Sequence, residues 1–406
     1  RREFSGRYTS EQNGVANAVA PELSSRGHWI VDSSSGRRVK LACVNWASHL
    51  TPMLAEGLHR KPVAVIAATI ARWGFNCVRL TYATAMFTNA TLSNSSVSHT
   101  FSSLGLHEAL SGLRAHNPHL LRLSTLDAFS AVAHELSAHG LLLILDNQIS
   151  TPGWCCASDD GNGFWGDRFF NPSEWLAALS AVAKRFSGSP HVVAMSLRNE
   201  LRGRRQSDAA WYRYMQMGAA AIHAANPRLL IIHGGLSYDQ NLRFLANRSL
   251  SSEARLRLRN KIVYEIHRYS FTNGDSYLHA DANRKCAAIT AQIESEAGFL
   301  RQPGRSFTGP LFVSEFGANE AGTSGNDARF LPCFFSFLAD GDLDWAVWAL
   351  QGSYYVRGGV VDADEMFGLF DHGWDMPRNA SFLRRLQALQ RPLMPSNGNG
   401  GNGGRG

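Results

Sequence analysis

Two glutamates stand at the ends of short apolar stretches, and their placement indicates chemistry. Glu200 closes the stretch Val192–Glu200, and Glu315 closes Leu311–Glu315. Apolar runs of this length, bounded by turn residues, are typical of buried parallel strands. The C-terminal ends of such strands are where α/β sheets and barrels hold their active sites. Two strands that each bring one carboxylate to a shared site match the pair of carboxyl groups that glycoside hydrolysis requires.

Each glutamate is predicted to have its own role. Cleavage of a glycosidic bond passes through an oxocarbenium-like state and needs an acid for the leaving oxygen and a nucleophile or a base. Glu200 is predicted as the acid/base, with Asn199 beside it to hydrogen-bond a sugar 2-hydroxyl. Glu315 is predicted as the nucleophile. It must stay ionised, and Arg79 and Tyr269 are its expected partners.

Further polar and aromatic residues fall at the same strand ends. Taken alone, each has an ordinary structural interpretation: Arg79 as an ion-pair partner, His267 as a buried histidine and Trp348 as core. Together they are more specific, because they follow most of the predicted strands. The predicted substrate-binding residues are Asn45, Trp46, Arg79, Asn147, Gln148, Trp154, Trp165, Asn199, His267, Tyr269 and Trp348, with Trp348 as an apolar floor for the sugar.

Eight short apolar segments alternate with amphipathic helical segments along the chain. This alternation predicts an α/β fold of the (β/α)8 TIM-barrel type, with the two glutamates at the C-terminal ends of strands 4 and 7. A doubly wound sheet with a second domain is the competing architecture, but no linker interrupts the alternation. The predicted strands are 39–46, 76–81, 141–146, 192–200, 229–233, 261–267, 311–315 and 344–350, and the predicted helices are 62–73, 125–139, 172–186, 207–225, 281–300, 327–339 and 378–390.

The predicted catalytic domain covers residues 27–392. Residues 1–26 are expected to form an N-terminal extension, in which Arg1–Gly6 is a candidate cloning remnant, and 393–406 a Gly/Asn-rich flexible tail. Residues 83–123 are rich in Ser, Asn and Thr, and we expect a loop at the barrel mouth with one short helix. No apolar run approaches the roughly 18 residues of a membrane helix, so no membrane association is expected.

The net charge of +7 raises the alternative of a nucleic-acid-binding protein. The arginines are scattered along the chain instead of forming runs, which favours an ordinary basic surface and no nucleic-acid partner. The motifs of other enzyme classes are missing or misplaced: the letters of GxGxxG occur at Gly161–Gly166, but inside a long loop and not between a strand and a helix.

Four N-glycosylation sequons begin at Asn89, Asn94, Asn247 and Asn379. Four such sites favour a glycosylated, secreted protein over chance occurrence. The six cysteines permit disulfides, with about 15 possible pairings. Cys43 and Cys77 lie inside predicted strands, where buried thiols are the simpler expectation.

Several of these motifs resemble glycoside hydrolase family 5, the cellulase-like family. The matching segments are Leu197–Glu200, Ser314–Gly317 and Val78–Leu80, together with His267, Tyr269 and Trp348. Asn45–Trp46, Trp154–Cys156, Gly161–Phe164 and Ser196–Gly203 look like its plant branch. The resemblance covers residues 27–390. It implies a barrel, a retaining mechanism without metal or cofactor, Glu200 as acid/base, Glu315 as nucleophile, and a secreted protein that we expect to be a monomer.

One position departs from the family pattern. After the third strand the family usually has Asp-x-His, and this chain has Asp146–Gln148. Gln148 can donate a hydrogen bond but cannot carry positive charge. This departure keeps open a second class of function, a carbohydrate-binding pseudoenzyme with weak or no hydrolysis. Within the enzyme class, the substrate is a β-linked glycan or glycoside, cleaved by endo-glucanase- or mannanase-like or by exo-glucosidase-like action.

Overall fold

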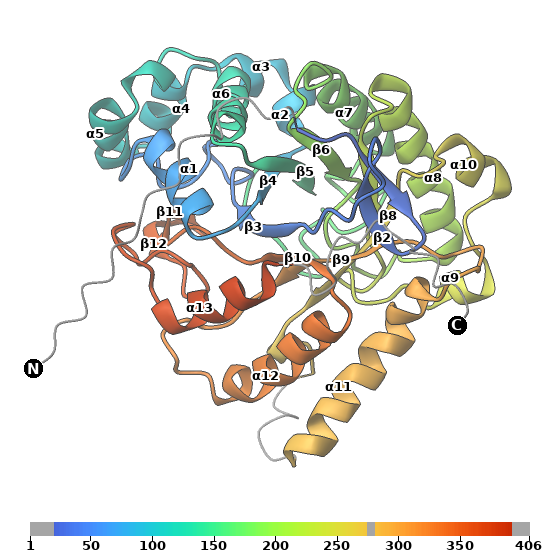
Figure 1. The fold of residues 1–406 in the computed structure, drawn as a ribbon. Coiled ribbons are helices and arrows are strands. Elements are labelled where there is room, and N and C mark those ends of the chain that lie inside the picture. The colour runs from blue at the N-terminus through green and yellow to red at the C-terminus, as the bar shows by residue number, and fades with distance from the viewer. Residues whose placement is uncertain (1–19, 274–280, 392–406) are drawn as a thin grey trace, which may run out of the picture.

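The computed structural model describes residues 20–273 and 281–391 (Figure 1). Its centre is a closed barrel of eight parallel strands in the order β10-β3-β4-β5-β6-β7-β8-β9. The predicted (β/α)8 barrel is therefore confirmed. The barrel strands are β3 (Ala42–Trp46), β4 (Cys77–Ala83), β5 (Leu142–Ile149), β6 (Val192–Ser196), β7 (Leu230–His233), β8 (Ile262–Arg268), β9 (Leu311–Phe316) and β10 (Asp344–Val347).

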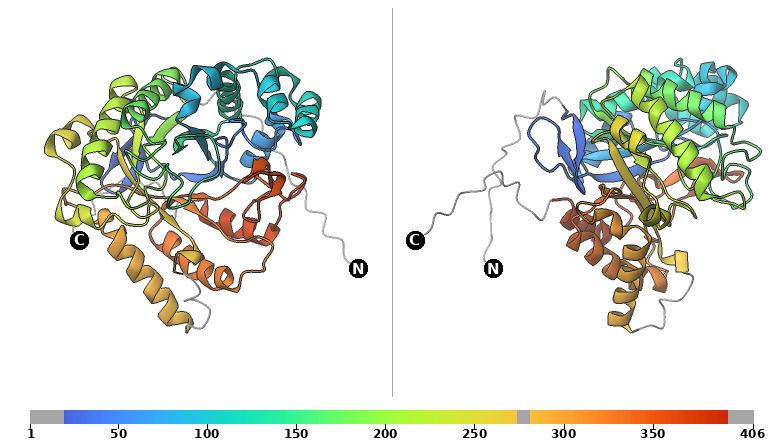
Figure 2. Two further views of the ribbon diagram at one scale, coloured as in Figure 1. Left: turned by 180° about the vertical axis from the view of Figure 1, so that it is seen from behind. Right: turned by 90° about the vertical axis from the view of Figure 1, so that its right-hand side faces the viewer.

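Helices surround the barrel, as both views of Figure 2 show. Their apolar faces pack on the outward side chains of the strands in one continuous core. Side-chain caps begin many of them, for example Ser124 before α6 and Asn171 before α7. The long helices are α1 (Val63–Arg72), α6 (Thr125–Ala138), α7 (Pro172–Arg185), α8 (Asp208–Ala225), α11 (Ala282–Glu296), α12 (Gly325–Asp340) and α13 (Ala380–Leu389), and shorter ones are α9 (Phe244–Asn247), α10 (Ser252–Arg257), η2 (Ser270–Asn273) and η3 (Gly298–Arg301). Within the described residues, no helix is long and apolar enough to cross a bilayer.

The prediction for residues 83–123 is wrong. Instead of a loop with one short helix, the segment folds into α2 (Ala85–Thr88), α3 (Ala90–Asn94), α4 (Val97–Ser103), α5 (His107–His116) and η1 (Pro118–Leu120). Its polar residues act as helix caps: the side chains of Asn89 and Ser96 accept hydrogen bonds from the first turns of α3 and α4. Buried side chains such as Phe101 and Leu113 join the main core, so the segment packs on the outer helices.

A β-hairpin at the start of the described chain pairs β1 (Leu23–Arg26) with β2 (Trp29–Asp32). Leu23 and Ile30 share an apolar cluster with interior barrel residues such as Ile144 and Phe312, so the hairpin closes one end of the barrel. The predicted domain limit after residue 26 cuts through this hairpin. The rest of the predicted extension, residues 1–19, and the tail 393–406 lie outside the described residues.

All six cysteines are paired in disulfides. Cys43 and Cys77 bond neighbouring strands β3 and β4, so the expectation of two buried thiols is wrong. Cys286 and Cys333 join α11 to α12, and Cys155 bonds its own neighbour Cys156. Sequence could not choose among the pairings, because side-chain proximity across parallel strands depends on their register.

The four sequon asparagines occupy two kinds of position. Asn89, Asn94 and Asn247 are exposed. Asn379 is half-buried, caps α13 and hydrogen-bonds Glu320. The first three are therefore the accessible sites for a glycan, and Asn379 is the least accessible.

Replacing both Cys43 and Cys77 by alanine is expected to lower the free energy of unfolding by roughly 3–4 kcal/mol, because a crosslink across 34 residues restricts the unfolded chain. Urea unfolding followed by tryptophan fluorescence measures the loss. As a control, both proteins are unfolded again in dithiothreitol, which also opens the wild-type crosslink. The difference in the free energy of unfolding between the two proteins should then shrink to the cost of two lost sulfur atoms. A difference of unchanged size would contradict the explanation by a crosslink.

Candidate active site

A cavity of about 490 Å³ opens at the C-terminal ends of the barrel strands. Both predicted catalytic residues line it, Glu200 just after β6 and Glu315 within β9. Trp348 follows β10 and lines the same cavity, and Trp154 and Phe271 bring partly exposed rings to it. Aromatic walls with a few convergent polar groups are typical of a ligand site.

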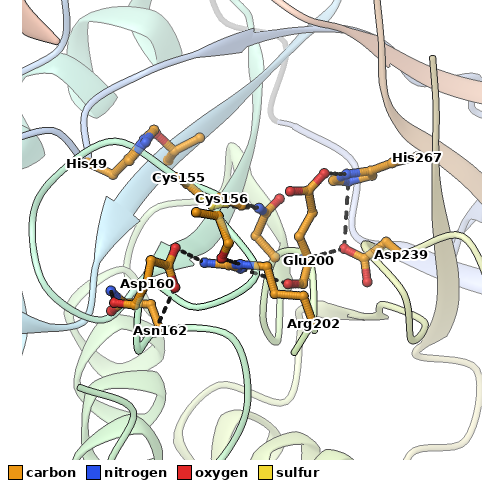
Figure 3. Close-up of a disulfide and its surroundings, with 12 residues drawn as sticks. His49, Cys155, Cys156, Asp160, Asn162, Glu200, Arg202, Asp239 and His267 are labelled. Carbon is orange, nitrogen blue, oxygen red and sulfur yellow. Dashed lines mark hydrogen bonds and ion pairs between the residues drawn. A yellow bond between two sulfur atoms is a disulfide. The ribbon is translucent and has the colours of Figure 1, made fainter. Parts of the chain in front are cut away.

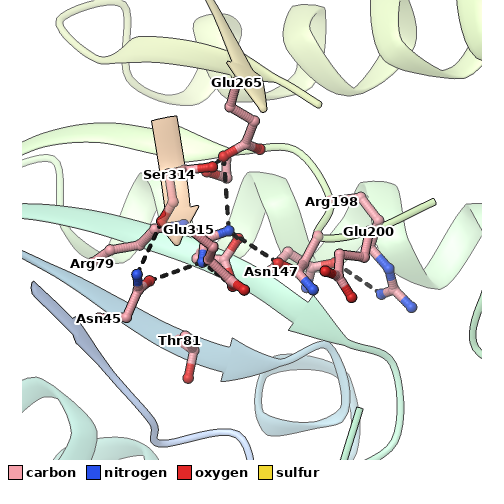
Figure 4. Close-up of polar contacts among 12 residues, drawn as sticks. Asn45, Arg79, Thr81, Asn147, Arg198, Glu200, Glu265, Ser314 and Glu315 are labelled. Carbon is pink, nitrogen blue, oxygen red and sulfur yellow. Dashed lines mark hydrogen bonds and ion pairs between the residues drawn. The ribbon is translucent and has the colours of Figure 1, made fainter. Parts of the chain in front are cut away.

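Glu315 is held on both carboxylate oxygens. Nη1 of Arg79 donates to Oε1 at 2.9 Å (Figure 4). The Tyr269 hydroxyl donates to Oε2 at 3.1 Å. Burial first, and the charges of Glu315 and Glu200 next, raise the pKa of Tyr269 well above 10, so its hydroxyl keeps the proton that it donates. Both carboxylate oxygens of Glu315 thus accept charge-assisted hydrogen bonds, which fix the position of the side chain in the cavity.

Arg79 is fully buried and links the strands around Glu315. Its Nη2 donates to Asp146 at 2.8 Å and to Asn199 at 3.1 Å, and its Nη1 also donates to Asn45 at 3.0 Å. Burial alone would lower the pKa of Arg79, but the carboxylates around it outweigh burial and raise it, so the guanidinium stays charged. Arg79 therefore fixes its neighbours from behind the cavity wall.

Glu200 adopts a left-handed backbone conformation with φ of 47°, unusual for a residue other than glycine. Its N–H donates to Oδ2 of Asp239 at 2.7 Å, and its carbonyl accepts from Nη1 of Arg202 at 2.8 Å. Its carboxyl group lies 3.0 Å from Nδ1 of His267 (Figure 3). The turn thus aims the side chain into the cavity, and three neighbours hold it there.

Burial raises the pKa of Glu200 to about 7, with a smaller contribution from Asp160, while Arg202 and Arg79 oppose the shift. Burial also lowers the pKa of His267 to about 4, so its ring is neutral near pH 7. The contact between the two is therefore a hydrogen bond of a neutral imidazole to a carboxyl group. A glutamate with this pKa is suited to donate a proton near neutral pH.

The two glutamates lie close together. A carboxylate oxygen of Glu200 and one of Glu315 are within 4.8 Å of each other. Retaining glycosidases place their carboxyl groups about 5–5.5 Å apart, whereas inverting enzymes leave about 6.5–9.5 Å for a water molecule. The separation fits the retaining arrangement.

The other predicted residues fall into two groups. Gln148, Trp154, His267, Tyr269 and Trp348 line the cavity. Arg79, Asn45 and Asn199 are fully buried behind its wall, where Arg79 donates to both asparagines and to Glu315.

Three further residues predicted to contact sugar do not line the cavity. Trp46 is fully buried, and its indole N–H donates to the carbonyl of Glu56. Trp165 packs among Phe164, Phe170, Trp175 and Tyr214 in the core. Asn147 is also fully buried, and it donates to the Thr84 hydroxyl and accepts from Arg198. Trp46 and Asn147 lie on strands, where side chains alternate between the two faces, so adjacent positions do not all face the cavity. Trp165 lies in the segment between β5 and α7.

Several residues that line the cavity were not predicted from the sequence. His49 follows β3 and its Nδ1 lies 2.7 Å from the Thr81 hydroxyl. Tyr238 follows β7, and Arg357 and Phe367 come from the segment after β10, which includes the hairpin of β11 (Ser353–Arg357) and β12 (Val360–Asp364). The position of His49 shortly after a strand was a usable signal, but the return of the hairpin to the cavity was not encoded in any local pattern.

Comparison with known proteins identifies relatives along most of the chain. The family model for cellulase (glycosyl hydrolase family 5) matches residues 40–353. A glycosyl hydrolase 5 family protein of Chamaecyparis obtusa is 47% identical over 374 residues, which are 91% of this chain and 66% of the relative. The chain thus spans about two thirds of that protein. An endoglucanase of Paenibacillus polymyxa is 21% identical over 85% of this chain and 84% of its own length.

Solved structures share the fold. A hyperthermophilic endocellulase from the archaeon Pyrococcus horikoshii superposes with a TM-score of 0.72 at 17% identity, covering 91% of this chain and 99% of that one. The catalytic domain of the major endoglucanase of Xanthomonas campestris pv. campestris gives 0.71 at 21% identity, with the same coverage. At these identities the likeness concerns the barrel alone. The match of the family model to most of the chain, on a barrel with two facing glutamates, shows that the chain belongs to glycosyl hydrolase family 5.

Proposed function

We propose that the protein is a retaining β-glycoside hydrolase with Glu315 as nucleophile and Glu200 as acid/base. The observation that carries the proposal is the separation of the two carboxylates, with oxygens within 4.8 Å of each other. The unequal surroundings of the two groups support the division of roles, because Glu315 binds a charged guanidinium and Glu200 has a pKa raised to about 7.

The reaction then has two displacements. Glu315 attacks the anomeric carbon while protonated Glu200 gives its proton to the leaving oxygen, which yields a glycosyl ester on Glu315. Ionised Glu200 next takes a proton from water as the water attacks the same carbon, and Glu315 leaves as a carboxylate. Arg79 and Tyr269 stabilise the Glu315 carboxylate at the start and the end of the cycle. Trp348 provides an apolar surface beside the reacting sugar.

The substrate class proposed is a β-linked glucan cut internally. The P. polymyxa and X. campestris relatives carry endoglucanase names, and the family model is that of cellulase. Tyr238 lines both the catalytic cavity and a second hollow, bordered by Gly161, Arg168 and Arg204. The two hollows are thus adjacent, which supports a groove that binds several sugar units.

We also propose that the protein is secreted and glycosylated. Three disulfides support an oxidising compartment. Asn89, Asn94 and Asn247 are exposed sequon positions. The X. campestris relative is described as a major extracellular endoglucanase.

The nucleophile is tested with Glu315→Ala. We expect turnover of an aryl β-glucoside to fall by about 10⁴-fold or more, because the covalent step is lost. Added azide should restore part of the rate and give a glycosyl azide of inverted configuration, identified by nuclear magnetic resonance. The matched variant Glu200→Ala should give an azide product of retained configuration. Full activity in Glu315→Ala, or inverted product from Glu200→Ala, would contradict the two roles.

The acid is tested by the pH dependence of kcat/KM. Glu200 must be protonated in the first step, so the rate should fall as pH rises through its pKa of about 7. A substrate with an activated dinitrophenolate leaving group needs no proton and should lose this alkaline limb. An alkaline limb centred near pH 4.5, or one that persists with the activated substrate, argues against Glu200 as the acid.

The aromatic rim is tested with Trp154→Ala. We expect KM for cellotetraose to rise about tenfold, since the stacking of one ring on a sugar contributes about 1–1.5 kcal/mol. Phe169→Ala is the matched control: both side chains are 38% exposed and lie under an arginine, but only Trp154 lines the cavity. Equal rises in KM for the two variants would contradict the proposal that Trp154 binds substrate in the groove.

A further inference from the structure

A buried arginine, Arg202, follows Glu200 by two residues and connects the acid/base to the segment after β5. Its side chain is 0% exposed, and all three of its guanidinium nitrogens donate hydrogen bonds. Nη1 donates to the carbonyl of Glu200 at 2.8 Å, Nε to that of Ala157 at 2.9 Å and Nη2 to Oδ2 of Asp160 at 2.5 Å (Figure 3). None of these contacts takes part in the two displacements described above.

The contact with Glu200 holds a backbone turn that most residues avoid. Glu200 has a φ of 47°, and a residue other than glycine keeps such a conformation only where its surroundings hold it. Asp239 accepts from the N–H of Glu200, and Arg202 donates to its carbonyl, so both peptide groups beside the side chain are held. The direction of the carboxyl group depends on this turn. Loss of either contact would let the acid/base move away from the leaving oxygen.

Arg202 packs closely against the segment 157–163. Its main-chain N–H donates to the carbonyl of Gly163 at 3.0 Å, and a Cβ added to Gly163 would lie 2.8 Å from Cγ of Arg202. Only glycine permits this close approach. Asp160 is held in turn, because its Oδ1 accepts from the N–H of Asn162 at 2.8 Å. The ion pair of Arg202 and Asp160 is therefore fixed at both ends.

We infer that Arg202 and Asp160 form a positioning pair for the acid/base, in which Arg202 fixes the Glu200 turn and Asp160 holds and neutralises Arg202. The inference rests on the proposed hydrolase function and adds two residues that act on its first step through Glu200. Neither residue is among the described residues that line the catalytic cavity, so neither is expected to touch the sugar.

The pair also acts on Glu200 through its two charges. Burial is the largest cause of the raised pKa of Glu200; among the charges, that of Arg202 lowers this pKa and that of Asp160 raises it. The two members of the pair thus oppose each other. Removal of one member should move the pKa of Glu200 in one direction, and removal of the other should move it in the opposite direction.

Other titratable and charged groups face Glu200 from the surrounding elements. They are Arg79 of β4, Tyr238 and Asp239 after β7, His267 of β8, Tyr269 just after β8 and Glu315 of β9. All of them remain in every variant compared below. A difference in pKa between these variants therefore reports on the positioning pair.

The positioning role is tested with two substrates that differ in their need for an acid. The leaving group of phenyl β-glucoside must receive a proton, whereas that of dinitrophenyl β-glucoside leaves without one. Arg202→Lys keeps the charge but lacks the planar fork that reaches three acceptors. Its kcat/KM should fall at least about tenfold more for the phenyl than for the dinitrophenyl substrate. A merely structural role would lower both values equally, and equal losses would overturn the inference.

The effect of charge is tested by the alkaline limb of kcat/KM for phenyl β-glucoside. Asp160→Asn leaves the charge of Arg202 unneutralised, so this limb should move to lower pH by about half a pH unit or more, short of the roughly 1–3 pH units of a charge in direct contact. Arg202→Met removes the positive charge and should move the limb to higher pH. Any other pattern of shifts would overturn the inference. If Arg202→Met does not fold, the direction of the shift in Asp160→Asn decides alone.

The matched control is Asp159→Asn, which removes the same charge one residue earlier. Asp159 is exposed and makes no hydrogen bond or ion pair within the part of the chain that the structure describes. Water and salt screen such a charge, so the alkaline limb should stay at its wild-type position. A shift as large as that of Asp160→Asn would make the effect one of net charge and would overturn the inference.

Failure of this inference can be told from failure of the proposed function. If the wild type hydrolyses neither substrate and Glu315→Ala behaves identically, the hydrolase proposal fails. The titration of Glu200 is then followed by nuclear magnetic resonance of protein with isotopically labelled glutamate carboxyl carbons, in which Glu200→Gln identifies the signal. Opposite shifts of the pKa of Glu200 in Asp160→Asn and Arg202→Met support the positioning pair, and any other pattern overturns it.

Discussion

The arrangement of the active site depends on one buried cation. Arg79 has no solvent contact, and the carboxylates of Asp146, Glu265 and Glu315 lie within 4 Å of its Nη atoms. A carboxylate buried without a partner is destabilised in its charged form and tends to take up a proton, and a protonated Glu315 could not act as the proposed nucleophile. A guanidinium suits this position because its planar donors reach several acceptors at once. The position and contacts of Glu315 are thus fixed by the centre of the barrel and not by Glu315 alone.

The same cation also produces the difference between the two glutamates. Glu315 receives a direct hydrogen bond from Arg79, whereas Glu200 receives none and contacts neutral His267. Burial without a charged partner at hydrogen-bond distance raises the pKa of Glu200. The left-handed turn at Glu200, held by Asp239, keeps its carboxyl group on the cavity side and away from the guanidinium.

The barrel could be predicted from sequence because its signals are local: apolar runs, helix caps and glutamates at strand ends. The sequence also placed both glutamates in one cavity. The sequence did not predict features that depend on the orientation of a side chain, or on a distant segment of the chain that lies at the cavity. Trp46 and Trp165 are close in sequence to residues that line the cavity, but both rings are buried in the core. Arg357 reaches the cavity because it lies on a hairpin that follows the last barrel strand. Residues 83–123 form five short helices that their polar composition did not indicate, because some of their Ser and Asn residues cap helices.

Gln148, the position that departs from the family pattern, shares the cavity lining with the Cys155–Cys156 disulfide. Gln148 and the Cys155–Cys156 disulfide line the same cavity, and neither carries a charge. The oxygen Oε1 of Gln148 is buried without a hydrogen-bond partner among the described residues, so it offers an acceptor to a sugar hydroxyl. A histidine there would add a group that titrates near neutral pH. Gln148 and the disulfide thus add only uncharged groups to the lining of the cavity. Contacts of a sugar with these two features would therefore depend on shape and on neutral hydrogen bonds.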